Sequence, residues 1–139
     1  MKSYKAIEES LSTPTVNEAA VAYWRQETLP YQKAKRVLDF LEFNQEESAH
    51  FLDVNPSTIS RWKSGNGTLS KLSSKMVYDV NEVIKKGIGI FGDEQNFLNW
   101  LETPNYALSN VTPKEMIQDP NGLGYVDEAL DALAWGAVV

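Results

Sequence analysis

A short segment in the middle of the chain carries the signals for two helices joined by a tight turn. Asn44, followed three residues later by Glu47, forms a capping box and starts a helix that we expect to reach Leu52. Asn55 and Pro56 start a second helix, because the missing N–H group of a proline is unpaired anyway in the first helical position. Only three residues separate the two helices, so they must cross at close range.

The second helix has one apolar face and one polar face. Ile59 and Trp62 lie three residues apart and therefore on the same side, and Ala49 supplies the small residue that a close crossing needs. We assign Trp62 to the core. A helix with an apolar back and a short polar front fits the major groove of DNA, so the segment predicts a helix-turn-helix. The alternative is a helical hairpin that exposes a polar face and binds nothing.

The predicted DNA-binding residues lie on these two helices. Arg61 can pair with a guanine through two hydrogen bonds or bind a phosphate, and Gln45 stands at a helix N-terminus, where backbone amides attract phosphate. Lys71 and Lys75 are further candidates for contacts with the DNA backbone. The predicted set is Gln45, Ser57, Thr58, Ser60, Arg61 and Lys63.

Charge divides the chain into three parts. Residues 1–30 have a net charge of −1, residues 31–92 of +2 and residues 93–139 of −7, which together give the net charge of −6. We therefore predict an N-terminal arm or helix over residues 1–30, a DNA-binding domain over 31–92 and an acidic domain over 93–139. The acidic domain would repel DNA, so it suits a different partner.

Composition excludes several kinds of site. The chain of 139 residues has no cysteine, so it has no disulfide and no cysteine-based zinc site, and its single histidine, His50, cannot form a multi-histidine metal site. We expect no metal, no cofactor and no enzymatic activity. No apolar run approaches the roughly 20 residues of a membrane helix, and the N-terminus lacks the apolar core of a signal peptide, so we expect a cytoplasmic protein.

Two patterns share residues with catalytic motifs but lack the context that gives those motifs meaning. Gly87-x-Gly89-x-x-Gly92 has the spacing of part of a dinucleotide-binding fingerprint, yet it follows a predicted helix rather than a strand. The acidic residues near the C-terminus are expected to form the solvated face of a helix: Asp127, Glu128 and Asp131.

Apolar spacing predicts helices along the rest of the chain and therefore an all-α fold. We expect a helix over residues 31–43, a left-handed end of the second motif helix at Gly65, and a long helix that Gly87 and Gly89 close. The acidic part adds three shorter helices: over residues 97–101, from the Thr112–Glu115 capping box to Asp119–Gly122, and over residues 126–134.

Residues 48–65 resemble the Xre/Cro-type helix-turn-helix family through the string SxxxLDVNPSTISRWKSG. The family usually has glycine where this chain has Asp53. Aspartate tolerates a positive φ better than most residues do, so the departure affects the geometry of the turn rather than the motif.

The acidic part resembles a second family. The pattern consists of FLNWLETPNYAL over residues 97–108, followed by Thr112-Pro113, Gly122, Val126 and Leu130. It is similar to the toxin-binding domain of Xre/MbcA/ParS-type antitoxins, and with the helix-turn-helix the resemblance covers about residues 31–139. It implies an Xre/Cro-like helix-turn-helix bundle followed by a small helical toxin-binding domain.

The resemblance also implies partners. The first is a RES-domain toxin, an enzyme that consumes NAD, and the antitoxin covers the entrance to its active site. The second is operator DNA, through which the antitoxin represses its own operon. A helix-turn-helix of this size normally binds a two-fold site as a homodimer, which we expect here.

The residues themselves support a partner for the acidic part. The acidic part has apolar residues that could anchor a partner, namely Trp100, Trp135 and the apolar chain end. Because the surrounding charge is negative, a cationic pocket would suit them. The predicted toxin-binding set is Trp100, Tyr106, Leu130, Leu133, Trp135, Gly136, Val138 and Val139. The alternative is that five of the apolar residues form the core of the domain itself: Trp100, Leu101, Val126, Leu130 and Leu133.

Two other functions stay open at this point. The chain could be a stand-alone helix-turn-helix regulator whose C-terminal domain dimerises or senses a ligand, or a structural adaptor with a vestigial helix-turn-helix. A neighbouring gene for a RES-type enzyme would favour the antitoxin over the regulator.

Overall fold

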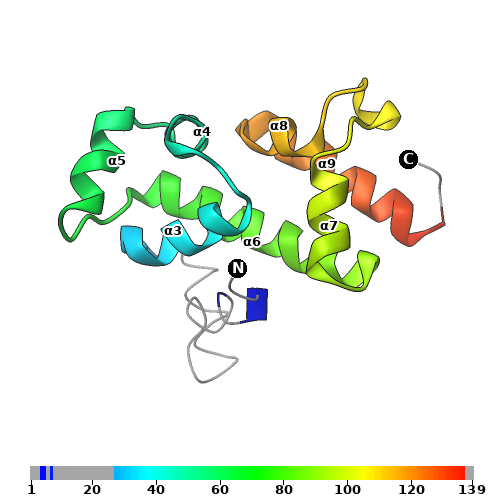
Figure 1. Cartoon of the computed structure of the whole chain (residues 1–139), viewed down its shortest axis with the longest axis horizontal. Helices are drawn as coiled ribbons and strands as arrows, with labels where there is room; N and C mark the ends of the chain where they lie inside the picture. Colours follow the sequence, from blue (N-terminus) through cyan, green and yellow to red (C-terminus); the bar gives the residue numbers. More distant parts are fainter. Residues whose placement is uncertain (1–3, 6, 8–26, 137–139) are drawn as a thin grey trace. The chain divides into compact units, whose positions relative to one another are not determined.

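The computed structural model describes residues 4, 5, 7 and 27–136, and every regular element within them is helical (Figure 1). This confirms the expected all-α class. The chain divides into two compact units, residues 1–81 and 82–139, which are described in turn. Most of the predicted N-terminal arm lies outside the described residues.

The first unit contains the helices of the predicted motif. They are α3 (Tyr31–Phe40), α4 (Gln45–Leu52), α5 (Pro56–Lys63) and the first turns of α6 (Lys71–Phe91). α3 ends three residues before the expected position because Glu42 adopts a left-handed φ of 60°. The backbone N–H of Phe43 then donates to Leu38 O at 3.1 Å, so Phe43 turns back into the core and is 8% exposed.

Helical spacing decides which side chains form the core of this unit. Ala34, Val37 and Leu38 lie on one face of α3 and are buried. Tyr4, from the predicted arm, is buried as well, and its ring meets the edge of Phe40 with centroids 4.9 Å apart. The Tyr4 hydroxyl donates to the backbone oxygen of Asn81 at 3.4 Å. At least this part of the N-terminal region therefore belongs to the first unit.

α6 is longer than expected and contains the glycines that we predicted would end it. Gly87 lies inside the helix, where it leaves room for the ring of Phe97. A methyl group at this position would come within 2.1 Å of Cε1 of Phe97. Gly89 also lies inside, and the helix stops at Gly92, which has a φ of 86°. The division of the chain after residue 81 therefore falls within α6, whereas we expected it after residue 92.

The second unit consists of the last turns of α6 and four shorter elements. These are α7 (Glu94–Leu101), a 3-10 turn (Tyr106–Leu108), α8 (Pro113–Ile117) and α9 (Pro120–Ala134). The segment that we expected to end a helix instead begins α9, because the Asp119 side chain accepts from the N–H of Asn121 at 2.8 Å and Pro120 takes the first position.

The core of the second unit is apolar and draws on each of its helices. Phe97 and Leu101 come from α7, Ile117 from α8, and Val126 and Leu130 from α9, and each is at most 1% exposed. Burying a side chain of this size contributes about 1.5–3 kcal/mol, so these few contacts hold the short helices together. The uncovered faces of α7 and α9 then determine what the unit can offer to a partner.

Candidate functional site

Hydrogen bonds fix the start of α4. The Asn44 side chain accepts from the N–H of Glu47 at 2.8 Å, and the Glu47 carboxylate accepts from the N–H of Asn44 at 2.9 Å. The expected capping box is thus confirmed. A helix N-terminus leaves four N–H groups unpaired, and two of them are engaged here, which fixes the residue at which α4 begins.

The turn between α4 and α5 depends on one left-handed residue. Asp53 has φ 58° and ψ 49°, and the N–H of Val54 donates to Ala49 O at 3.0 Å. Asp53 therefore takes the conformation for which related motifs use glycine. The end of α5 differs from our expectation, because the helix ends at Ser64 with φ −93° and Gly65 is not left-handed.

Gln45 joins α4 to α5 through its side-chain amide. Its Nε2 donates to Pro56 O at 2.8 Å and to Ser60 Oγ at 2.7 Å, and its Oε1 accepts from Lys63 Nζ at 3.3 Å. Both amide hydrogens are thus used within the protein. The side chain positions α5, so a phosphate at the start of α4 would be bound by backbone N–H groups other than those of Asn44 and Glu47, which the capping box engages.

α5 presents its polar residues outward and its apolar residues inward. Ile59 is buried, and the half-buried Trp62 ring lies 5.6 Å from that of Tyr31. Arg61 is exposed, and its guanidinium donates to Thr58 Oγ1 at 3.3 Å. The predicted residues of this helix all lie in exposed or half-buried positions: Ser57, Thr58, Ser60, Arg61 and Lys63.

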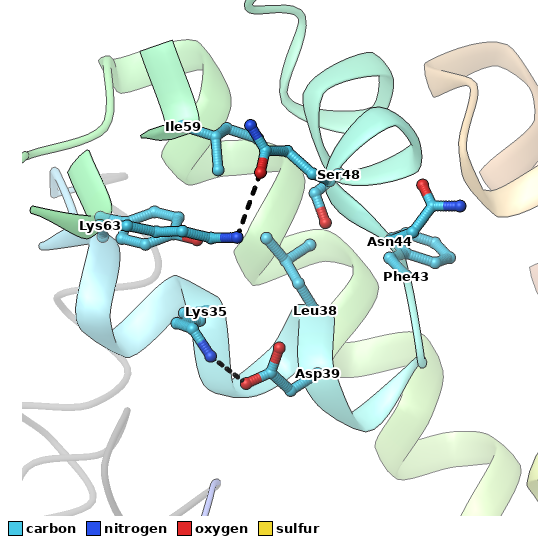
Figure 2. Close-up of a pocket in the computed structure, with 10 residues that line it drawn as sticks. Lys35, Leu38, Asp39, Phe43, Asn44, Ser48, Ile59 and Lys63 are labelled. Carbon is cyan, nitrogen blue, oxygen red and sulfur yellow. Dashed lines mark hydrogen bonds and ion pairs between the residues drawn. The ribbon is translucent and has the colours of Figure 1, made fainter. Parts of the chain in front are cut away.

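A small cavity lies between α3, α4 and α5. Its volume is about 70 Å³, and Leu38 and Ile59 form part of its apolar wall. Figure 2 shows the two contacts at its rim, Lys63 to Gln45 and Lys35 to Asp39, and the hydroxyl of Ser48 facing inward. Sites for small molecules occupy about 300–1,000 Å³, so this space does not suit a cofactor.

Three aromatic rings form a cluster in the second unit. Phe91 lies 5.5 Å from Trp100 and 6.2 Å from Phe97, measured between ring centroids, and Phe97 fills the space beside Gly87. Trp100 is half-buried, and its indole N–H has no hydrogen-bond partner among the described residues. Trp100 therefore serves the packing of α6 against α7 and remains partly exposed.

The structure separates the predicted toxin-binding residues into core and surface. Leu130 is fully buried, so it packs α9 into the unit, and Leu133 is half-buried. Tyr106 is 87% exposed and Trp135 is 90% exposed. Gly136 is exposed with a φ of 87°. The last two predicted residues lie outside the described part of the chain: Val138 and Val139.

Our sequence reasoning missed an ion-pair cluster that orders the acidic residues of α9. Lys86 Nζ, from α6, donates to Asp127 Oδ1 at 2.8 Å and to Asp131 Oδ1 at 2.7 Å. These hydrogen bonds raise the pKa of Lys86 above its ordinary value. Asp127 and Asp131 therefore do not lie on the purely solvated face of α9 that we expected. Their spacing of four residues, which places both carboxylates on one side of the helix, could have indicated that they share a cation.

No group of three or more histidine, cysteine, aspartate or glutamate side chains among the described residues is placed to hold a metal ion. None of the helices in that part of the chain is long and apolar enough to cross a membrane.

Comparisons with known proteins address the second unit most directly. Residues 87–136 match the family model of the antitoxin Xre/MbcA/ParS C-terminal toxin-binding domain. A chain from the crystal structure of the M. tuberculosis MbcT–MbcA toxin–antitoxin complex is similar over 76% of this chain and 94% of that chain, with a TM-score of 0.53 and 21% identity. That structural likeness shows a common fold. No curated protein matches the chain.

The matched domain defines the class: residues 87–136 form an antitoxin toxin-binding domain, which supports a place for the chain in a toxin–antitoxin pair with a toxin as its partner. More particularly, this domain is of the Xre/MbcA/ParS type, and the resemblance seen in the acidic part of the sequence is confirmed.

Proposed function

We propose that this antitoxin neutralises a RES-type, NAD-consuming toxin by covering the entrance to its active site. The match of residues 87–136 to a toxin-binding domain carries the proposal. The resemblance of the sequence to antitoxins of RES-domain toxins supplies the class of toxin. Neutralisation is by binding alone, in the cytoplasm, and needs no catalytic group on the antitoxin.

Charge and exposure support an interaction of this kind. Residues 82–139 contain three basic and nine acidic side chains, a net charge of −6. A pocket that binds a dinucleotide phosphate is commonly cationic, so an acidic unit is drawn to its entrance. Tyr106 and Trp135 project from this acidic unit, and exposed aromatic side chains often dominate the energy of protein–protein interfaces.

We further propose that the first unit binds operator DNA and represses the antitoxin's own operon. The tight turn at Asp53 and the bonds from Gln45 hold α5 in place, with its polar face uncovered. Arg61 is the residue most suited to read a base, because its guanidinium can donate twice to a guanine. A homodimer would place two copies of α5 in successive major grooves.

Co-expression with the product of the neighbouring gene tests neutralisation. We expect a stable complex in a pull-down and suppressed NAD consumption. Removing residues 135–139 should release the toxin's activity, whereas Leu72→Ala should not, although Leu72 is also an exposed apolar side chain at 63%. If the shortened protein still protects cells, the chain end is not the part that blocks the toxin.

Operator binding is tested with Arg61→Ala, measured against the promoter of the operon and against unrelated DNA. Loss of about 1–3 kcal/mol on the operator alone would mark Arg61 as a base contact, and equal loss on both would mark it as a phosphate contact. Lys33→Ala removes an exposed cation from α3 and should change little. Wild-type protein that does not prefer its promoter would refute the repressor proposal.

The alternative is a stand-alone regulator whose C-terminal unit dimerises or senses a ligand. The geometry of α4 and α5 supports the regulator and the antitoxin equally, because it does not involve residues 87–136. A protein that binds its promoter but forms no complex with the neighbouring gene product would support the regulator.

A further inference from the structure

The outer face of α9, together with its C-cap residue Trp135, carries two exposed aromatic residues and one acid. Tyr125 is 58% exposed, Glu128 is exposed and Trp135 is 90% exposed. They are three and ten residues apart, and at 100° per residue this places all three within one side of the helix. The buried Val126 and Leu130 lie on the other side, so packing within the unit does not use this face.

Glu128 differs from the other acids of α9 in having no cation beside it. Asp127 and Asp131 both accept hydrogen bonds from Lys86, at 2.8 and 2.7 Å. Among the described residues, Glu128 takes part in no ion pair, although its unit has an excess of acidic side chains. The carboxylate is thus available to a cation from another molecule.

The groups beside Glu128 indicate which cation fits. Tyr125 lies one helical turn before Glu128, which brings a ring face and a carboxylate to adjacent positions on the surface. A guanidinium is planar, donates two parallel hydrogen bonds to a carboxylate and stacks on aromatic rings, whereas an ammonium group does only part of this. The pair therefore suits arginine better than lysine.

We propose that Tyr125 and Glu128 hold an arginine side chain of the cognate toxin, with Trp135, the C-cap residue of α9, as a second anchor seven residues after Glu128. The inference rests on the proposed neutralisation of a toxin and names the contact that carries it. The negative charge of the unit attracts a cationic surface, and the exposed rings exclude water from the ion pair once the two proteins meet.

The test is the dissociation constant of the full chain for the toxin encoded beside it. Glu128→Gln keeps the size of the side chain and removes its charge, and we expect binding to weaken at least about tenfold. Tyr125→Ala should weaken binding to a similar degree, whereas Tyr125→Phe keeps the ring and should stay within about threefold of wild type. Both positions are exposed, so the variants should fold, which circular dichroism verifies.

A matched control and a cycle of double substitutions make the test specific. Glu82→Gln removes the same charge from an exposed residue of the same unit, outside α9, and should bind like wild type. Each exposed arginine of the toxin is then changed to lysine, alone and together with Glu128→Gln. One arginine should show coupling, so that its substitution costs little once Glu128 is already altered.

The outcomes separate the two proposals. A wild-type chain that does not bind the toxin overturns both the proposed function and this contact. Tight binding by wild type, with Glu128→Gln and Tyr125→Ala binding equally well, overturns the contact and leaves neutralisation intact. Equal weakening by Glu82→Gln would show a general effect of charge and would also overturn the contact.

Discussion

Single residues set the geometry of α4 and α5, the helices proposed to bind DNA. Asp53 occupies the left-handed region at φ 58°, where most side chains cost about 1–2 kcal/mol. The side-chain amide of Gln45 donates hydrogen bonds to Pro56 and Ser60 of α5, and the guanidinium of Arg61 donates to the hydroxyl of Thr58. These contacts explain why a motif with only two eight-residue helices can present a defined surface.

Asp53→Gly should raise the free energy of unfolding by up to about 1 kcal/mol, because glycine adopts this conformation without strain. Asp53→Ala should lower it, since aspartate tolerates a left-handed φ better than alanine does. Chemical denaturation of the two variants measures the difference. Stabilisation by alanine would show that the strain at residue 53 has been misjudged.

At the scale of elements, helix starts with a recognised cap could be predicted, whereas the start of α9 and most helix ends could not. Starts follow from local signals, and Asn44 with Glu47, Pro56 and Pro113 all lie where the sequence placed them. Helix ends depended on tertiary contacts. Gly87 indicated a helix end from the sequence, yet it lies inside α6, where glycine is needed because the ring of Phe97 occupies the space of a side chain.

The same limit applied to the candidate site. The residues of α5 could be assigned from helical spacing, because a two-sided helix needs only local information. Leu130 was included in the toxin-binding set, with the domain core as the alternative, and it is fully buried; Tyr125 was overlooked although it is exposed. Both depend on which face of α9 meets the rest of the unit, and the sequence pattern alone did not show where Lys86 would lie.

Two glycines of α6 should respond to alanine with opposite signs. Gly87→Ala should destabilise the protein by about 1–3 kcal/mol, because the methyl group would overlap the buried ring of Phe97. Gly89→Ala should stabilise it by about 0.5–1 kcal/mol, since nothing lies within 4 Å and alanine is the better helix former. Thermal unfolding of both variants distinguishes them, and equal effects would contradict the packing described for Gly87.

The hydrogen bonds of Lys86 tie α6 to α9 and should make stability depend on alkaline pH. Because the folded state raises the pKa of Lys86, this stabilisation is fully present below about pH 10.4, the ordinary lysine value, and disappears as the pH rises through the folded pKa. Lys86→Met should therefore lower stability at pH 7 by about 1 kcal/mol and have less effect at the alkaline end.

Unfolding curves of Lys86→Met and wild type, recorded from pH 7 to 11, measure this dependence. Lys85→Met is the comparison, because the Lys85 ammonium lies 3.9 Å from Glu82 and should contribute less. A constant gap between Lys86→Met and wild type at every pH would rule out the charged pair as its origin.

The whole molecule divides its charge as it divides its fold. Residues 1–81 contain ten basic and ten acidic side chains, whereas residues 82–139 contain three and nine. A neutral unit with Arg61 and Lys63 on α5 can approach DNA, and an acidic unit is repelled by it. The two proposed binding functions are therefore assigned to different units, and we expect each to change without the other.

Substitutions in the two units should act independently. Arg61→Ala should affect only operator binding, and Glu128→Gln only toxin binding, because the residues share no partner. A full-length protein with both changes should show each defect to within about 0.5 kcal/mol of the single variants. Titration of the double variant with operator and with toxin provides the comparison, and a larger deviation would reveal coupling between the units.

The tryptophans described above differ in their access to water, and this gives the protein built-in optical reporters. Trp62 packs on Tyr31 in the first unit, Trp100 lies in the aromatic cluster of the second, and Trp135 is 90% exposed. Emission from an exposed indole is red-shifted and accessible to iodide, whereas a packed indole emits at shorter wavelength and is shielded. Occupation of the α9 surface can therefore be followed through Trp135 as a loss of quenching, without attaching a dye to either protein.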